Sequence, residues 1–272
     1  MQNIFLGIDG CKAGWATIEI IPDPKLFNSK SESWDFHLFP TITYLFEHYQ
    51  KLGILPDLNS VEENHLTINC TNIQILIDIP IGLKESGPIE RKCDSEARAF
   101  LGPKRGSSVF RVPVRKTVYC SDTYEETSKI NYDMTTKKIS KQTYYICKKI
   151  REVDEFICSK NSIFDITSVL HESHPEVVFT SLAGTQLLFP KRTKAGFIER
   201  MKIIKEYNNS IESFISDIYK NFKKDQVQPD DILDASVLAV AAKNIFLTGK
   251  IKRFPAEPEI DNKRISMEII SL

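Results

Sequence analysis

The sequence has no excess of charge of either sign, because lysine plus arginine and aspartate plus glutamate number 36 each in its 272 residues. No overall positive field therefore draws the protein to nucleic acid or to an anionic membrane, so any site for a polyanion must be a local patch. No apolar run approaches the roughly 18 residues that a spanning helix needs, and we expect no membrane partner.

Paired cysteines are also missing, since no two of the six are spaced as Cys-x-x-Cys. With no secretory leader visible before the first apolar run, we expect free thiols in a cytoplasmic protein. Cys11 follows a predicted strand, but no histidine or helix N-terminus is predicted beside it to activate the thiol. The six cysteines are Cys11, Cys70, Cys93, Cys120, Cys147 and Cys158.

What the chain does have is a series of strand patterns in its first third. Residues 4–8 are apolar, 15–21 alternate, and the two together predict a hairpin. Residues 34–39 alternate again and lead into a segment with helical spacing over 42–52. Residues 73–77 are nearly all β-branched and apolar, which is typical of a strand buried on both faces of a parallel sheet.

The middle of the chain differs, because no long strand is predicted from residue 82 to about 165. We interpret 82–165 as an insertion that contains helices over 94–101 and 141–156 and a loop over 102–117. Residues 166–179 return to strand character, and Pro175 within them predicts a strand at a sheet edge.

The last part predicts a basic helix over 193–222 and a second helix from Asp231 to about Thr248, with Asp230 as its N-cap. An extended segment over 264–270 closes the chain. This order of elements is that of the ribonuclease H-like fold. We therefore predict one α/β domain over 1–272, with a mixed five-stranded sheet in the order 3-2-1-4-5 and helices on both faces.

Two carboxylates follow strands that this fold makes neighbours. Asp9 and Asp78 each stand at the C-terminal end of a predicted strand, where ligands collect in open α/β sheets. Neighbouring strands lie about 4.8 Å apart, so the two carboxylates would repel unless a cation lay between them. The pattern favours a site for Mg²⁺ or Mn²⁺, although Asp before Gly is also a common turn.

Further acids complete the predicted metal site. Asp231 and Asp234 lie three apart on the last helix, although first-turn acids also stabilise a helix dipole. Glu176 follows His174 and Pro175, and it is either a metal ligand or general base or a solvated charge on an edge strand. His174 is the candidate proton carrier.

Basic residues cluster in two places, over 91–116 and over 191–200, where Lys191 and Arg192 also lie. Such patches would let a neutral protein hold a nucleic-acid backbone or a nucleotide, although solvated loop charge also explains each residue singly. The residues that we expect to bind phosphate are Arg91, Arg98, Arg105, Ser107, Ser108, Arg115, Lys194 and Arg200.

Several blocks in order along the chain resemble the domain of unknown function 429 family, predicted nucleases with a ribonuclease H-like fold. The matching blocks are residues 7–11 with 14–15, 77–83, 91–93, 107–110, 174–176, 191–194 and 231–235. The acids at 231 and 234 also resemble those of the terminal helix in Holliday-junction resolvases of this fold.

Three hypotheses of function follow. The first is a metal-dependent nuclease in which Asp9, Asp78, Glu176 and Asp234 hold two metal ions, with Asp231 in support. The second is a nucleotide-dependent phosphotransferase of the actin and sugar-kinase type, whose second glycine-rich loop is not apparent here. The third is a non-catalytic binding protein on the same fold. DNA, RNA and a small nucleotide all remain open as substrates.

Overall fold

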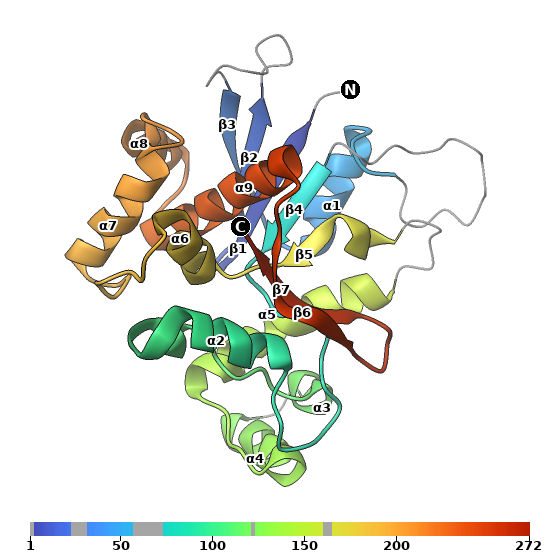
Figure 1. Ribbon diagram of the computed structural model, residues 1–272. Coiled ribbons are helices and arrows are strands. Elements are labelled where there is room, and N and C mark those ends of the chain that lie inside the picture. The colour runs from blue at the N-terminus through green and yellow to red at the C-terminus, as the bar shows by residue number, and fades with distance from the viewer. Residues whose placement is uncertain (1–2, 23–31, 57–72, 121–122, 160–164) are drawn as a thin grey trace.

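A five-stranded mixed sheet forms the centre of the computed structural model, which describes residues 3–22, 32–56, 73–120, 123–159 and 165–272 (Figure 1). The sheet order is β3-β2-β1-β4-β5, as predicted. Strand β2 runs antiparallel to β1 and β3, whereas β4 is parallel to both β1 and β5. The strands are β1 (Ile4–Cys11), β2 (Gly14–Pro22), β3 (Glu32–Phe39), β4 (Ile73–Ile77) and β5 (Leu170–Glu172).

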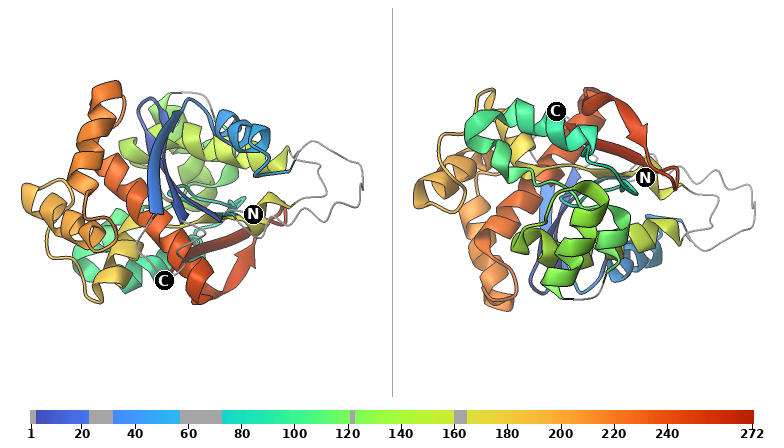
Figure 2. Two further views of the ribbon diagram at one scale, coloured as in Figure 1. Left: turned by 90° about the horizontal axis from the view of Figure 1, so that it is seen from above. Right: turned by 90° about the horizontal axis from the view of Figure 1, so that it is seen from below.

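Helices cover both faces of this sheet (Figure 2). Because successive side chains of a strand point to opposite faces, β1 contributes Leu6 and Ile8 to one buried cluster and Phe5 to the other. The first cluster includes side chains of α1 (Ile42–Lys51) and α5 (Lys141–Cys158), and the second includes those of α9 (Pro229–Thr248).

Helix α9 lies directly against β1. Gly7 makes this approach possible, since a Cβ there would overlap the carbonyl oxygen of Ala235 and the amide nitrogen of Ala239. Asp9 is two residues further along β1 and therefore points to the same face as Gly7. The close approach thus brings Asp234 of α9 to the end of the strand that carries Asp9.

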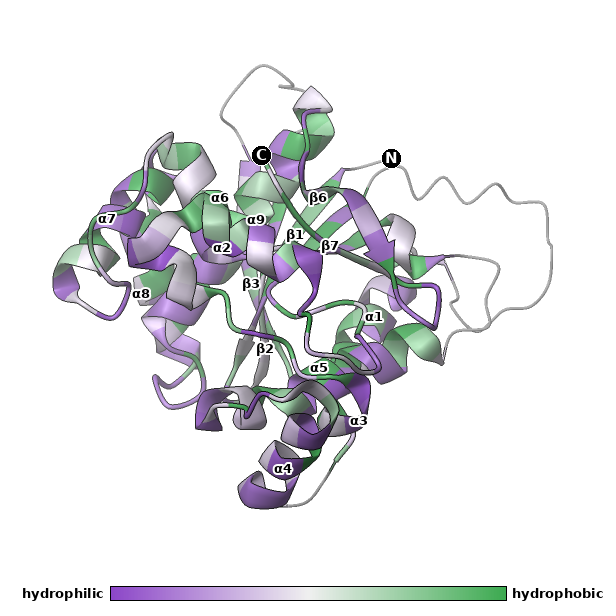
Figure 3. Cartoon of the chain, turned by 60° about the horizontal axis from the view of Figure 1, so that its bottom comes forward, coloured by the Kyte–Doolittle hydropathy of each residue, from purple (hydrophilic) through white to green (hydrophobic). Residues whose placement is uncertain are grey.

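The segment between β4 and β5 is helical, and the structure has no strand in its described residues there, as predicted. It contains α2 (Lys92–Arg105), α3 (Arg115–Val118), α4 (Tyr124–Thr135) and α5. Helix α4 was not predicted and is largely hydrophilic (Figure 3). Its start is fixed by a capping box, in which Thr123 and Glu126 each accept from the other's backbone amide.

The predicted strand over 166–179 is wrong. Strand β5 covers only Leu170–Glu172, and Pro175 begins helix α6 (Pro175–Ala183) with His174 as its N-cap. Proline suits the first helical position, because its missing N–H would have no partner there and its fixed φ is already helical. The proline therefore marks the start of a helix and not the edge strand that we expected.

Three further corrections concern the C-terminal part. The predicted basic helix is two helices, α7 (Lys194–Lys205) and α8 (Ile211–Asn221), separated at Asn208-Asn209-Ser210, which are turn-forming residues. The N-cap of α9 is Gln228 and not Asp230. The predicted final strand is β7 (Ser266–Ser271), which pairs with β6 (Lys252–Ile260), a strand that we did not predict.

Within the described ranges no helix is long and apolar enough to cross a membrane. The cysteines Cys11, Cys93, Cys120, Cys147 and Cys158 are free thiols, whereas Cys70 lies outside the described residues.

Candidate functional site

Three carboxylates from three elements meet at one edge of the sheet. Asp9 lies near the end of β1, Asp78 directly follows β4, and Asp234 lies in the second turn of α9. The backbone amide of Asp78 donates to the carbonyl of Ile8 at 2.9 Å, so the parallel pairing of β4 with β1 continues to the level of Asp9. Asp9 and Asp234 are only 8% and 3% exposed, so water screens their charges poorly.

These carboxylates disfavour one another's charge. Burial raises the pKa of Asp9 well above its ordinary value, and the nearby charges of Asp78 and Asp234 raise it further. Burial also raises the pKa of Asp78, with His174 acting in the opposite direction and Asp234 in the same one. A cation placed among these groups would stabilise the charged form of both carboxylates and so lower both pKa values.

The described structure already has one cation there, the ammonium group of Lys191. Its Nζ lies 2.6 Å from Oδ2 of Asp234 and 4.0 Å from Oδ2 of Asp230. Burial lowers the pKa of Lys191, but Asp234, Asp9 and Asp78 more than offset this and hold it above its ordinary value. The sequence placed Lys191 in a basic cluster, but only the fold shows that it reaches the carboxylates.

The donor chemistry fits a hard divalent cation, although no ready cage exists. Among the residues that the structure describes, no group of three or more histidine, cysteine, aspartate or glutamate side chains is arranged to hold a metal ion. Mg²⁺ does not need such a cage, because it is commonly bound by one or two carboxylates, waters and substrate phosphates. Asp9 and Asp78 supply carboxylates of this kind, with Asp234 beside them.

Glu176 and Arg200, which we expected to bind metal and phosphate, instead bind each other. Arg200 Nη2 lies 2.5 Å from Oε1 of Glu176, and Nε donates to Oε2 at 3.3 Å. The two side chains are 5% and 2% exposed, Glu176 being the first of these. Because the pair is buried and mutually neutralised, its visible role is to tie α6 to α7.

His174 and Asp231 both have helix-capping contacts. His174 Nδ1 accepts from the amide of Glu176 at 3.2 Å, so the proton of the neutral ring is on Nε2, which lies 3.2 Å from the carbonyl oxygen of Ser108. Asp231 accepts from the amide of Gln228 at 2.8 Å. These contacts fix the starts of two helices, α6 for His174 and α9 for Asp231.

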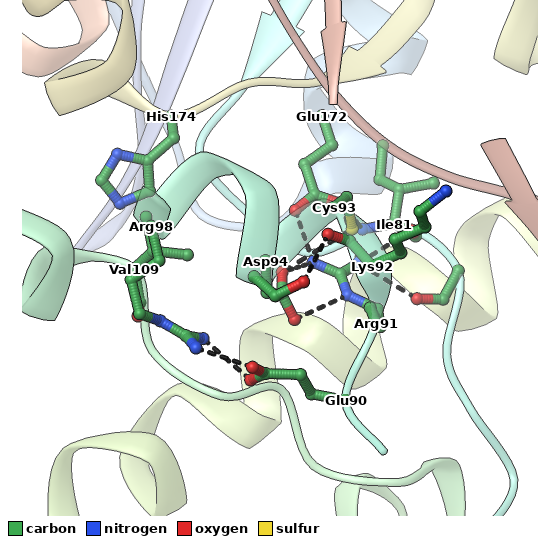
Figure 4. A network of polar contacts seen from close by, with 12 residues as sticks. Ile81, Glu90, Arg91, Lys92, Cys93, Asp94, Arg98, Val109, Glu172 and His174 are labelled. Carbon is green, nitrogen blue, oxygen red and sulfur yellow. Dashed lines mark hydrogen bonds and ion pairs between the residues drawn. The ribbon is translucent and has the colours of Figure 1, made fainter. Parts of the chain in front are cut away.

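Three other arginines that we expected to bind phosphate are also engaged by carboxylates. Arg91 is buried and pairs with Asp94 and Glu172, and Arg98 forms a two-pronged pair with Glu90 (Figure 4). Arg115 contacts Glu85, Asp154 and Asp261. Arg91 and Arg115 thus join the segment between β4 and β5 to the rest of the chain, and Arg98 ties two parts of that segment together.

A pocket of about 370 Å³ opens beside the carboxylates, and most of the remaining residues that we expected to bind phosphate line it. Arg105, Ser107 and Ser108 line it as expected, whereas Lys194 is exposed at the start of α7 outside it. Arg192 and several apolar side chains also line it and had no predicted role. The lining residues are Asp78, Pro80, Arg105, Ser107, Ser108, Phe110, Gln142, Ile146, His174, Pro175, Glu176, Pro190, Lys191, Arg192 and Asp234.

Comparison with known proteins gives a family but no characterised relative. No curated protein and no solved structure matches the chain. The family model described as "Protein of unknown function (DUF429)" matches residues 7–260, nearly the whole chain. The resemblance seen in the sequence blocks is thereby confirmed, and the chain belongs to the DUF429 family.

Proposed function

We propose that this protein is a metal-dependent nuclease that hydrolyses phosphodiester bonds in nucleic acid. The observation that carries the proposal is the meeting of Asp9, Asp78 and Asp234 at the edge of a pocket that also contains unpaired arginine. Carboxylates that raise one another's pKa favour a cation, and arginine side chains favour a phosphate. A phosphodiester bound with a divalent metal ion satisfies both demands.

The proposal includes assignment to the ribonuclease H-like fold, with residues 82–165 as an insertion. Its support is the strand order β3-β2-β1-β4-β5, the parallel pairing of β1 with β4, and the packing of α9 across β1. In this arrangement acids at the ends of β1 and β4 and on α9 face one another, which is the placement that the proposed chemistry requires.

Several groups in and beside the pocket have a part in the proposed reaction. Asp9, Asp78 and Asp234 hold Mg²⁺ or Mn²⁺, which when bound lowers the pKa of water and polarises the phosphate. Lys191 neutralises Asp234 in the free protein and is close enough to contact the phosphate instead. Arg105, Arg192 and the Ser107 and Ser108 hydroxyl groups orient the phosphate.

The test compares Asp9→Asn with Asp133→Asn, which changes an exposed carboxylate of α4 outside the pocket. Cleavage of labelled single-stranded and duplex oligonucleotides is measured with Mg²⁺, with Mn²⁺ and with chelator. We expect metal-dependent cleavage by the natural protein and by Asp133→Asn, and none by Asp9→Asn. Metal binding is read separately from the rise in melting temperature on adding Mn²⁺, which stabilises only a state that binds it.

Absence of cleavage under all metal conditions would refute the proposed nuclease, and absence of metal-induced stabilisation would refute the proposed metal site. ATP hydrolysis without nuclease activity would instead favour the phosphotransferase hypothesis.

A further inference from the structure

The pocket has an apolar side as well as a charged one. Phe110, Ile146 and Pro80 line it together with the arginines, serines and carboxylates. We propose that the pocket takes a single unpaired nucleotide, whose base stacks on Phe110 and Ile146 while its phosphate contacts Arg105 and Arg192. The inference rests on the proposed function for the choice of a nucleic-acid substrate, and it adds which form of that substrate the site accepts.

The size of the pocket favours one nucleotide over a duplex. At about 370 Å³ it lies near the lower end of the range of sites for small ligands, which is about 300 to 1,000 Å³. Enzymes that bind one base in such a pocket must take it out of the stack, and this costs least when the strand is already single. A base that enters this pocket therefore comes most readily from an unpaired position.

The arginines of the chain separate into two groups that identify the phosphate end. One group is neutralised by carboxylates of the protein itself: Arg91, Arg98, Arg115, Arg151, Arg200 and Arg253. Arg105, Arg111, Arg192 and Arg264 form no ion pair with the described residues, and of these four only Arg105 and Arg192 line the pocket. Guanidinium groups that the protein leaves without a counter-charge are available to an anionic ligand.

Arg105 has a second feature that points to a ligand. Its Nε is buried and finds no hydrogen-bond acceptor among the residues that the structure describes. Buried donors nearly always have partners, so one without a partner calls for an acceptor from outside the chain. A phosphate oxygen supplies such an acceptor, with the Ser107 and Ser108 hydroxyl groups close by in the same lining.

The apolar side of the pocket provides a surface on which a base can stack, and a phosphate alone would not use it. An aromatic ring such as Phe110 offers a stacking surface that accepts every base, which gives affinity for single strands with little sequence preference. Phe110 and Ile146 pack against the core on one side, and inorganic phosphate or a sugar phosphate would leave their pocket-facing surface uncovered. The combination of the two sides therefore specifies a nucleotide.

The experiment measures equilibrium binding in chelator at fixed salt concentration, so that it does not depend on metal or on catalysis. Fluorescence anisotropy compares a labelled single-stranded oligonucleotide with the duplex of the same sequence. Competition with a nucleoside monophosphate, ribose 5-phosphate and inorganic phosphate then separates recognition of the base from that of the phosphate. Displacement by the free nucleotide indicates that a small nucleotide suffices, and displacement only by unlabelled strand indicates that the ligand is part of a chain.

Two variants with matched controls test the two ends of the pocket. Phe110→Leu keeps the apolar surface but removes the ring, and Tyr145→Leu removes an exposed ring that is outside the pocket. Arg105→Gln and the exposed neighbour Lys104→Gln remove one positive charge each. We expect Phe110→Leu and Arg105→Gln each to weaken single-strand binding roughly tenfold, with much smaller effects of the controls.

Equal affinity for duplex and single strand, or displacement of the strand by inorganic phosphate as effectively as by the nucleotide, would overturn the inference, and both measurements use the natural protein. Unchanged binding in a folded Phe110→Leu variant would overturn it as well. Tight single-strand binding without any metal-dependent cleavage would refute the proposed nuclease and leave the nucleotide pocket in place. Metal-dependent cleavage that prefers duplex would support the proposed nuclease and refute the nucleotide pocket.

Discussion

Replacing Arg200 with methionine should destabilise the protein strongly without touching the three carboxylates of the candidate site. Arg200 and Glu176 are 2% and 5% exposed and are joined by two hydrogen bonds. The substitution leaves the Glu176 carboxylate buried with no counter-charge. Loss of one partner from a buried ion pair costs about 3 to 5 kcal/mol, so we expect that loss in the free energy of unfolding.

The double variant Glu176→Gln/Arg200→Met provides the critical comparison. It has no unpaired charge, and neutral replacements of buried pairs are often tolerated, so it should be at least about 2 kcal/mol more stable than the sum of the single changes implies. Urea denaturation followed by circular dichroism measures each free energy. Lys205→Met, which breaks a surface pair with Glu212, is the control and should cost no more than about 1 kcal/mol.

Additive single effects, or a loss below about 1 kcal/mol for Arg200→Met, would show that the pair is not the buried unit described here. The double variant also tests the predicted ligand role of Glu176. If it folds but no longer binds Mn²⁺, then Glu176 belongs to the metal site after all.

Three further predictions concern other parts of the fold. Without metal, Asp9→Asn should raise the melting temperature, because it removes the buried charge whose pKa burial and its neighbours raise; a decrease would contradict the repulsion. Gly7→Ala should cost about 3 kcal/mol in the free energy of unfolding, because α9 leaves no room for the methyl group; a fully stable variant in urea denaturation would refute this contact. Burial lowers the pKa of His171 in the folded protein. The neutral ring is therefore fully compatible with the fold above the ordinary pKa of about 6.5. Stability is lost as the pH falls from there through the lowered pKa of the folded state, because the unfolded chain binds the proton more readily. His171→Gln should therefore reduce the difference between free energies of unfolding at pH 7.5 and pH 5.5, and an unchanged difference would contradict the assignment.

The sheet could be predicted from sequence because its signals are local. Residues 73–77 are mostly apolar and β-branched over a length that suits a buried strand, and the structure has β4 at those residues. The order of the strands followed from the sequence of elements along the chain, and it is confirmed. Prediction failed at residues 166–179, where a short apolar run fits a strand and a buried helix equally well. The choice depended on Pro175, whose fixed φ suits either an edge strand or the first turn of a helix.

The acids of the candidate site could be predicted from the sequence for a related reason. Asp9 and Asp78 follow strands, and the ends of parallel neighbours meet at one edge of a sheet, so their placement follows from topology. Asp234 needed the additional fact that α9 crosses β1 at Gly7. No comparable rule places Lys191, which reaches Asp234 from the loop before α7.

The arginines show why charge in a sequence does not identify a phosphate site. A basic cluster shows how many cations a segment has but not which carboxylates they meet, and some of those partners lie far away along the chain. Arg115 contacts Asp261, which is 146 residues distant, and Arg91 contacts Glu172, which is 81 residues distant. Such ion pairs occupy the same arginine side chains that the sequence favours as ligand contacts. The arginine that binds a ligand is therefore best recognised in the fold as one that the protein leaves unpaired beside a pocket, and Arg105 meets both conditions.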